Sequence, residues 1–431
     1  MQFDSTWQRD IQAIIQMHHT GVFQVSYALD RSVNLVARMA GLSVAPIIYF
    51  STPNQVRQYA SVGAWRILSF DEAANMVDTC AAPIRCFGIQ PFLNDPQATY
   101  GNFWVLPIVW LEYDDHHAQI HMVVDQTGAS KQVVFDTVSE IVNAVLAGTE
   151  IPLANPTADM WVHVPNKSLW KQQVAHAQQM MANSNLEKVV LSRQTHFYFS
   201  SRMNPFAVVR GLQAHDASVY HFCVKVSAHA AFVGGTPERL FERSYNQLAT
   251  DAIAGTYVRG SQDPSESLAA FTSNSKQIHE HQLVVDYLRE CLTHLCDTVQ
   301  EDTCRRRLVL SRLVHFLVAF KGQLKSFIGV TDILDRLHPT PAVAGFPVAA
   351  SCKAIQRLEG YSRTWYAGTM GHMARNDAQV IVAIRSGWVT DSCVRVYAGA
   401  GILPASNSDD EWRELDGKIQ LFYDMFTQEA G

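Results

Sequence analysis

Three ionisable side chains near the end of the sequence share one face of a predicted helix. The segment SDDEWRELDGK, residues 408–418, places Glu411, Glu414 and Lys418 at positions i, i+3 and i+7. At about 3.6 residues per turn these positions lie together. A solvated helix face explains the same pattern, because Ser408 and Glu411 fit a capping box and Glu414 and Lys418 fit an ion pair. The segment alone leaves both interpretations open.

Four further polar side chains lie where a core pattern predicts apolar ones. Lys188, flanked by valines in EKVVLSR, either extends to the surface or is buried. Glu238 follows a strand that ends in two glycines, and an exposed turn would look the same. Glu280 shares the apolar face of the helix predicted over 274–291, unless it pairs with Lys276 at i,i+4. Arg385 ends an apolar strand, where a guanidinium calls for a carboxylate or a phosphate.

These residue types together indicate chemistry on a small dianionic substrate. Glu280 and Glu414 offer the hard oxygen ligands that suit Mg²⁺. A desolvated lysine and a buried glutamate are candidates for base and acid. Arg385 and Lys418 remain to bind substrate carboxylates. Convergence of these residues on one site does not follow from their spacing.

The elements that must position them alternate between helices and strands without a regular βαβ rhythm. Apolar and β-branched runs predict strands, and 3.6-residue periodicity predicts helices. We expect helices over 131–147 and 167–184. We expect strands over 22–29, 45–52, 65–70, 84–92, 102–113, 119–125, 186–199, 220–226, 230–235, 313–324, 379–389 and 393–401. This order favours an α+β fold with large, mostly antiparallel sheets.

Composition excludes several classes of protein. The chain has 431 residues, 48% of them hydrophobic, and a net charge of -6 without a basic cluster of the size that nucleic acids or anionic membranes require. No apolar stretch reaches the ~18 residues needed to span a bilayer, and we expect no signal peptide. The eight cysteines form no CxxC pair and predict reduced thiols, so we expect a cytoplasmic protein.

Eight ordered segments from about residue 165 resemble the chorismate-utilising enzymes, the family of isochorismate synthase, salicylate synthase and the large subunit of anthranilate synthase. The segments are EKVVLSR, FVGGTPERL, AIAGTYVRG, SKQIHEH, LHPTPAVAGFP, WYAGTMG, VAIRSG and VYAGAGILPASNSDDEWRELDGK. The resemblance implies an anthranilate-synthase component I-like fold, with two stacked, mostly antiparallel sheets and outer helices. Residues 1–150 would then be the N-terminal β-rich part, 151–165 a linker, and 166–431 the chorismate-binding core.

Within the family the chain is most similar to isochorismate synthases of the menaquinone type. The resemblance implies that water attacks chorismate at C2 while the C4 hydroxyl leaves. Lys188 matches the general base and Glu238 the general acid. Glu280 and Glu414 match the Mg²⁺ ligands, and Glu411 matches an acid that reaches the metal through water.

The resemblance also implies a set of substrate contacts. The residues that match them are Arg385 and Tyr366 for the enolpyruvyl carboxylate, Lys418, Gly255, Thr256 and Gly399 for the ring carboxylate, and His338, Ala342 and Val343 near C2 and C4. Chorismate is the expected partner, without an obligatory glutaminase subunit, in a monomer or homodimer.

Two departures and two alternatives accompany this expectation. Gln277 stands where salicylate and anthranilate synthases carry a glutamate, which favours isochorismate synthase, and Thr236 replaces a serine. Salicylate synthase, which adds pyruvate elimination, is the first alternative. A non-catalytic relative that binds a carboxylate is the second. The sequence leaves a menaquinone or a siderophore pathway open.

Overall fold

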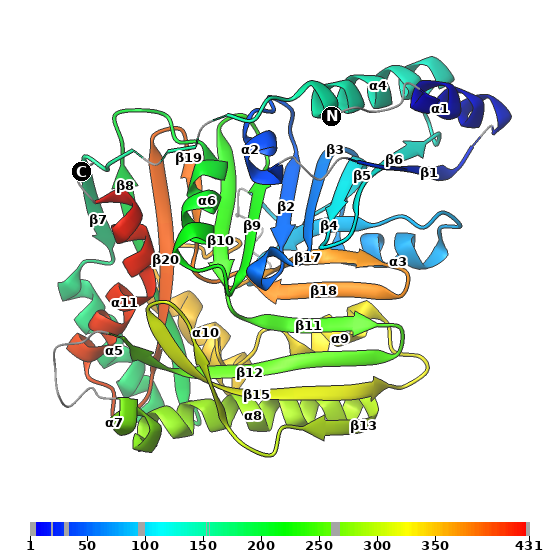
Figure 1. Ribbon diagram of the computed structural model, residues 1–431. Coiled ribbons are helices and arrows are strands. Elements are labelled where there is room, and N and C mark those ends of the chain that lie inside the picture. Colours follow the sequence, from blue (N-terminus) through cyan, green and yellow to red (C-terminus); the bar gives the residue numbers. More distant parts are fainter. Residues whose placement is uncertain are drawn as a thin grey trace.

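A computed structural model describes residues 6–18, 20–29, 34–93, 100–151, 153–154, 156–259 and 268–427 (Figure 1). None of the described helices is long and apolar enough to cross a lipid bilayer. The helices are α1 Thr6–Met17, α2 Leu35–Ala40, η1 Pro53–Gln55, α3 Phe70–Thr79, α4 Lys131–Ala147, α5 Lys167–Ala182, α6 Pro205–His215, α7 Leu268–Ser273, α8 Ser275–Leu295, α9 Val330–Leu337, α10 Val348–Leu358 and α11 Ser408–Phe426.

Strands make up the interior of the molecule. They are β1 Val22–Ala28, β2 Ile47–Ser51, β3 Gln58–Leu68, β4 Cys86–Gln90, β5 Phe103–Tyr113, β6 Ala118–Asp125, β7 Met160–Val164, β8 Lys188–Tyr198, β9 Tyr220–Lys225, β10 Ala230–Thr236, β11 Arg239–Ser244, β12 Gln247–Val258, β13 Cys296–Glu301, β14 Arg306–Val309, β15 Leu313–Leu324, β16 Gly345–Phe346, β17 Thr369–Ala374, β18 Asp377–Val382, β19 Ser386–Thr390 and β20 Cys393–Ile402.

Two groups of strands run in different directions in Figure 1. In the first strand group the pairing order is β1-β6-β5-β3-β2-β9-β10-β19-β20-β8-β7, with the short β16 also on β8. In the second strand group it is β4-β17-β18-β11-β12-β15, with β13 and β14 on the outer side of β15. These pairs are antiparallel, so the predicted α+β fold with large antiparallel sheets is confirmed.

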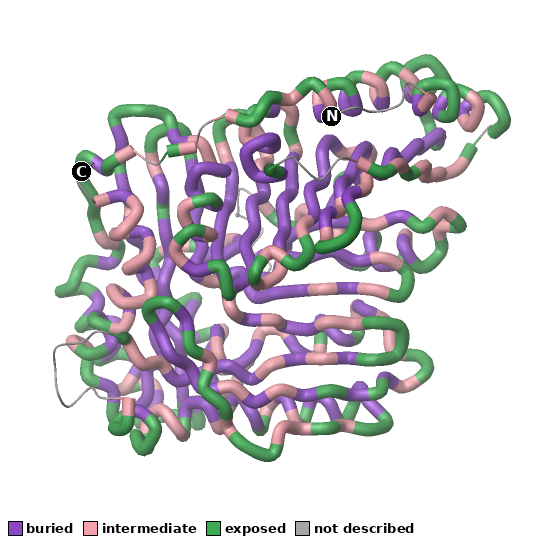
Figure 2. The backbone as a smooth tube through the Cα atoms, viewed as in Figure 1, coloured by how far each residue is buried: buried purple, intermediate pink, exposed green. Residues whose placement is uncertain are grey.

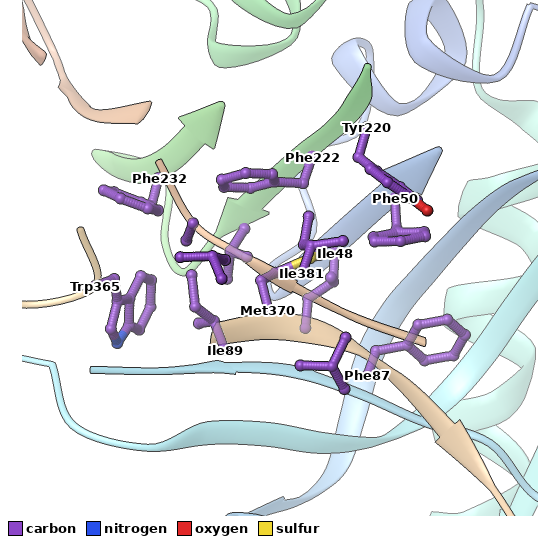
Figure 3. Packing of buried hydrophobic residues seen from close by; sticks show 14 of the residues in the cluster. Ile48, Phe50, Phe87, Ile89, Tyr220, Phe222, Phe232, Trp365, Met370 and Ile381 are labelled. Atoms are coloured by element: carbon purple, nitrogen blue, oxygen red, sulfur yellow. The ribbon is translucent and has the colours of Figure 1, made fainter. Parts of the chain in front are cut away.

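Strand β5 joins the two groups into one hydrogen-bonded network. Its residues 109–113 pair with β6, and its residues 103–105 pair with β4. Side chains from β2, β9 and β10 face those from β4, β17 and β18 across a hydrophobic core, as the labelled residues of Figure 3 show. Figure 2 shows that burial is concentrated along the strands, whereas the outer faces of the helices are exposed. The two stacked sheets expected from the sequence correspond to these groups.

The predicted linker, residues 151–165, includes a strand of its own. Residues 152 and 155 lie outside the described part of the chain. Met160–Val164 form β7, which pairs with β8. The N-terminal strand β2 also pairs with β9, and β4 pairs with β17, so strands from before and after 151–165 share the network. The division of the chain at 151–165 therefore stays a prediction.

Two helices cover the region where the predicted site residues gather. α8 lies on β12, and α11 lies on β20. Each begins at an asparagine whose side chain accepts backbone N–H groups of the first turn, Asn274 for α8 and Asn407 for α11. In α11 the buried positions recur every three or four residues, at Trp412, Leu415, Ile419, Phe422 and Phe426. This apolar stripe fixes which side of α11 faces the sheet.

Candidate active site

One cavity brings most of the predicted site residues together. The predicted residues that line it are Glu238, Gly255, Thr256, Glu280, Ala342, Val343, Tyr366, Arg385, Gly399 and Lys418. They come from β12, β20, α8, α11 and the connections between other strands. The cavity lies where the two strand groups meet. Two of its lining residues, Glu238 and Arg385, belong to connections that lead from one strand group to the other.

These two connections position the candidate acid and the candidate carboxylate clamp. Glu238 lies between β10 and β11, and Arg385 lies between β18 and β19. The N–H of Gly235 donates to the carbonyl of Arg385 (3.1 Å), and the N–H of Val382 donates to the carbonyl of Glu238 (3.0 Å). The predicted single strand over 379–389 is therefore broken in two. Arg385 has a φ of 48°, which interrupts an extended strand.

Lys188 is fully buried at the start of β8 and does not extend to the surface. Its Nζ lies 2.9 Å from Glu280 Oε1. Burial disfavours the charge of Glu280, but the charge and hydrogen bond of Lys188 outweigh it and hold the pKa of Glu280 below its ordinary value. A Cβ at position 401 would lie 2.5 Å from Glu280 Oε1, so Gly401 provides the space for this ion pair.

Glu238 is also buried, but its pKa is shifted in the direction opposite to that of Glu280. Burial raises the pKa of Glu238 from 4.5 to about 7, although the positive charges of Lys188, Lys418 and Arg385 partly oppose the rise. The Oγ1 of Thr236 accepts the backbone N–H of Glu238 (3.2 Å), so threonine supplies the hydroxyl that shapes this turn. Near neutral pH the carboxyl of Glu238 is thus able to hold a proton and to release it, as a general acid requires.

Arg385 is oriented by a histidine that sequence reasoning missed. Its Nη2 lies 2.6 Å from His315 Nε2, and His315 Nδ1 lies 2.8 Å from the carbonyl of Gly255. Burial and the charge of Arg385 hold the pKa of His315 well below its ordinary value. The neutral ring therefore donates from Nδ1 to the carbonyl and accepts the guanidinium at Nε2. Within the described residues Arg385 forms no salt bridge with a carboxylate.

Two glycines allow backbone to approach the cavity closely. Gly255 lies at a register shift between β12 and β15 with a φ of 70°, a conformation that glycine adopts without strain. The carbonyl of Gly399 accepts Lys418 Nζ (2.8 Å). A Cβ at position 399 would lie 2.7 Å from the hydroxyl of Tyr366. A Cβ at position 255 would lie 3.0 Å from Phe316 Cδ2 and 3.2 Å from the carbonyl oxygen of Gln277, so close packing around the cavity also favours glycine there.

The face of α11 that the sequence singled out is turned inward. Lys418 Nζ lies 2.7 Å from Glu414 Oε1, so the expected ion pair is confirmed. Glu411 is 1% exposed and bonds to Lys276 of α8. The expected capping box is wrong, because Asn407 and not Ser408 caps the helix and the Glu411 side chain bonds to Lys276. The i,i+4 pair between Lys276 and Glu280 does not form either, since each has a closer partner.

Other predicted residues occupy less direct positions. The ring of His338 lies against the carbonyl of Ala367 (2.9 Å) and does not line the cavity, whereas Ala342 and Val343 do. The backbone N–H of Thr256 donates to Gln277 Oε1 (2.8 Å). Gln277, the residue that departs from the family pattern, therefore fixes the backbone beside Gly255.

The three predicted metal ligands are glutamates, which offer the hard oxygen donors that a divalent cation such as Mg²⁺ takes. Glu411 and Glu414 lie near each other, and burial together with the charge of Glu414 raises the pKa of Glu411 to about 7. Lys276 experiences the negative charges of Glu411, Glu414 and Glu280. Crowded carboxylates that disfavour each other's charge suit Mg²⁺. Each glutamate is turned toward a lysine, and no three acidic, His or Cys side chains in the described ranges already surround one point.

Three contributors to the site gave no usable signal in the sequence: His315, Gly401 and Lys276. His315 is a lone histidine in an apolar strand, and its partners come from distant segments. Gly401 belonged to a glycine-rich segment but was not distinguished from Gly399. Lys276 was considered only as an i,i+4 partner within α8.

Comparison with known proteins finds relatives over almost the whole chain. Residues 21–427 match the family model described as chorismate binding enzyme. The chain is 28% identical over 426 residues to an isochorismate synthase of Haemophilus influenzae, covering 97% of this chain and 95% of the relative. The solved menaquinone-specific isochorismate synthase of Escherichia coli has a TM-score of 0.86 at 24% identity, covering 98% and 99% of the two chains.

A more distant solved structure shares the fold. Anthranilate synthase component I of Streptococcus pneumoniae has a TM-score of 0.69 at 20% identity, covering 88% of this chain and 90% of that one. The likeness to the two solved structures establishes the fold, as the sequence predicted. The match over residues 21–427 confirms the resemblance on which the predicted activity rests.

Proposed function

The chain belongs to the family of chorismate-binding enzymes, and on that premise we propose that it is an isochorismate synthase. It interconverts chorismate and isochorismate by moving a hydroxyl from C4 to C2 of the ring. The observation that best supports this proposal is Glu238. It is a buried carboxyl with a pKa of about 7, in the same cavity as Arg385, Lys418 and Glu280, and Glu280 pairs with Lys188 behind the cavity lining.

Lys188 is the proposed general base. Its amine takes a proton from the water molecule that attacks C2, and both ring double bonds shift as the C2–O bond forms and the C4–O bond breaks. In the Lys188–Glu280 ion pair this nitrogen is an ammonium, so it must first release a proton, to Glu280 or to solvent, before it can accept one from water. Glu238 gives its proton to the departing C4 hydroxyl, which leaves as water. In the reverse direction the same two groups exchange roles, so the reaction is reversible.

The remaining polar groups bind the two carboxylates of the substrate. Arg385, oriented by His315, binds the enolpyruvyl carboxylate together with the hydroxyl of Tyr366. Lys418 and the backbone of Gly255 and Gly399 bind the ring carboxylate. A guanidinium favours such binding because its parallel N–H groups match a carboxylate.

Mg²⁺ is the proposed cofactor, and Glu280 and Glu414 are its proposed ligands, with Glu411 reaching it through water. A divalent cation there supplies charge neutralisation and a fixed position for the ring carboxylate. The crowding of the three carboxylates near Lys276 supports this assignment.

We further propose that the product supplies menaquinone biosynthesis. The support is the likeness over almost the full length of both chains to a menaquinone-specific enzyme. Restoration of menaquinone in a bacterium that lacks its own menaquinone-specific isochorismate synthase tests this assignment. Failure there, with active protein present, would point to a siderophore pathway.

A product assay tests the proposed activity. Purified protein is incubated with chorismate and Mg²⁺, or with EDTA, and the products are resolved by liquid chromatography with fluorescence detection of salicylate. We expect Mg²⁺-dependent isochorismate in equilibrium with chorismate, from wild-type protein and not from Glu238→Gln. Enzyme-dependent salicylate and pyruvate would establish a salicylate synthase instead. Binding of chorismate without turnover would indicate a non-catalytic relative.

A further inference from the structure

A lysine that the reaction scheme does not use lies among the three proposed metal-binding glutamates. Lys276 is the second residue of α8, and its Nζ bonds to Glu411, a side chain that is almost fully buried. The carboxylates of Glu414 and Glu280 are close enough for their charges to act on this ammonium as well. Glu280 and Glu414 have lysine partners of their own, at 2.9 and 2.7 Å.

Lys276 lies on the side of the carboxylates away from the substrate cavity. That cavity is lined by Glu280 and Lys418 but not by Lys276. Lys276 instead lines an outer groove of about 710 Å³, together with Ser275 and His279 of α8 and residues 403–405 after β20. The Lys276 side chain is 27% exposed, while its ammonium bonds to the buried carboxylate of Glu411.

One ammonium in this position has two physical consequences. It engages an oxygen of Glu411, so this carboxylate is less available as a direct metal ligand. It also places a fixed positive charge beside the position of a divalent cation and weakens the binding of that cation. A substrate carboxylate adds negative charge on the opposite side and offsets this effect.

We propose that Lys276 is a positioning residue of the metal site. It keeps Glu411 out of direct coordination and holds the intrinsic affinity for Mg²⁺ low, so that the metal and the dianionic substrate bind cooperatively. The inference rests on the proposed function, because it takes Glu280 and Glu414 as the metal ligands. It concerns binding and not turnover, so the two can be tested separately.

Titration calorimetry of MgCl₂ into metal-free, full-length protein without chorismate tests the inference. We expect Lys276→Met to bind Mg²⁺ about tenfold more tightly than the wild type, the size expected for removing one positive charge near a divalent ion in strongly screened surroundings. Lys276→Gln, which can still donate a hydrogen bond to Glu411, should bind more tightly too. Addition of chorismate should improve Mg²⁺ affinity less in both variants than in the wild type.

A second lysine provides a matched control. Lys171 of α5 pairs with Asp409 of α11 (2.9 Å), an acid outside the cavity, and Lys171→Met should leave the affinity for Mg²⁺ unchanged.

Thermal unfolding in EDTA should show a lower Tm for Lys276→Met than for the wild type, with a larger rise on adding Mg²⁺.

The inference would be overturned if Lys276→Met and Lys276→Gln bound Mg²⁺ no more tightly than the wild type. It would also be overturned if none of these proteins bound Mg²⁺. If the wild type converts chorismate while the affinities are unchanged, only the inference fails. If the wild type binds Mg²⁺ and the variants bind it more tightly, but chorismate is not converted, the proposed function fails and the role of Lys276 stands.

Discussion

Replacement of Glu238 by glutamine should increase stability at alkaline pH while it removes activity. In the folded protein the pKa of this carboxyl is about 7, compared with 4.5 for an ordinary glutamate. Below pH 4.5 the carboxyl is protonated in both folded and unfolded chains and makes no difference. Between pH 4.5 and 7 the unfolded chain ionises first, so stability falls as pH rises. Above pH 7 the cost is complete, at roughly 3 kcal/mol.

Glutamine keeps the shape of the protonated acid and carries no charge, so it relieves this cost. We expect Glu238→Gln to gain roughly 3 kcal/mol in the free energy of unfolding at pH 8 and almost nothing at pH 4.5. Its kcat should fall by about 10²–10⁴, the usual contribution of a general acid. Urea unfolding followed by circular dichroism at the two pH values, with the product assay, measures both effects.

A glutamate on the adjoining strand is the control for this experiment. Glu242 of β11 is 43% exposed and pairs with Arg239, so Glu242→Gln should change stability by less than about 1 kcal/mol at either pH. If Glu238→Gln is less stable than the wild type at pH 8, or retains wild-type activity, the argument that burial sets the protonation of this acid is refuted.

Three further substitutions test other parts of the structure. Lys188→Ala should abolish turnover and leave chorismate binding by calorimetry largely intact; a rate above about a tenth of the wild type would exclude Lys188 as the base. Glu414→Gln should raise the Mg²⁺ concentration for half-maximal activity by about tenfold or more, and an unchanged requirement would contradict its role as a ligand. Arg363→Met should cost about 3–5 kcal/mol in denaturant unfolding, because it leaves Glu359 buried without its partner at 2.6 Å. The exposed Arg357→Met should be nearly neutral, and equal losses in both would refute the argument.

The sequence predicts those parts of the site that depend on local spacing. The period of α11 places Glu411, Glu414 and Lys418 on one face, although the period leaves open whether that face is solvated, and the position of Glu280 on the apolar face of α8 predicts its burial. Partners across the fold could not be predicted in this way. Lys276 has a plausible partner four residues away, but its actual partner, Glu411, lies 135 residues further along the chain.

The break between β18 and β19 shows the same limit in the backbone. Residues 379–389 are almost uniformly apolar or β-branched, so local preference favours one continuous strand. Contacts with β10 and with the turn at Glu238 impose the left-handed conformation of Arg385 instead. Tertiary contacts thus override a local preference at a residue whose guanidinium faces the cavity.

The two connections between the strand groups hold Glu238 and Arg385 at a fixed relative position. Glu238 and Arg385 are tied by backbone hydrogen bonds to each other's strands, so neither can shift without the other. The main chain therefore fixes the relative position of the two residues, and the hydrogen bond to His315 restricts the guanidinium of Arg385. If Glu238 and Arg385 have the proposed roles, we expect the protein to favour ligands whose span from leaving hydroxyl to enolpyruvyl carboxylate matches that spacing. Analogues with a longer or shorter side arm should be rejected however well their charges match.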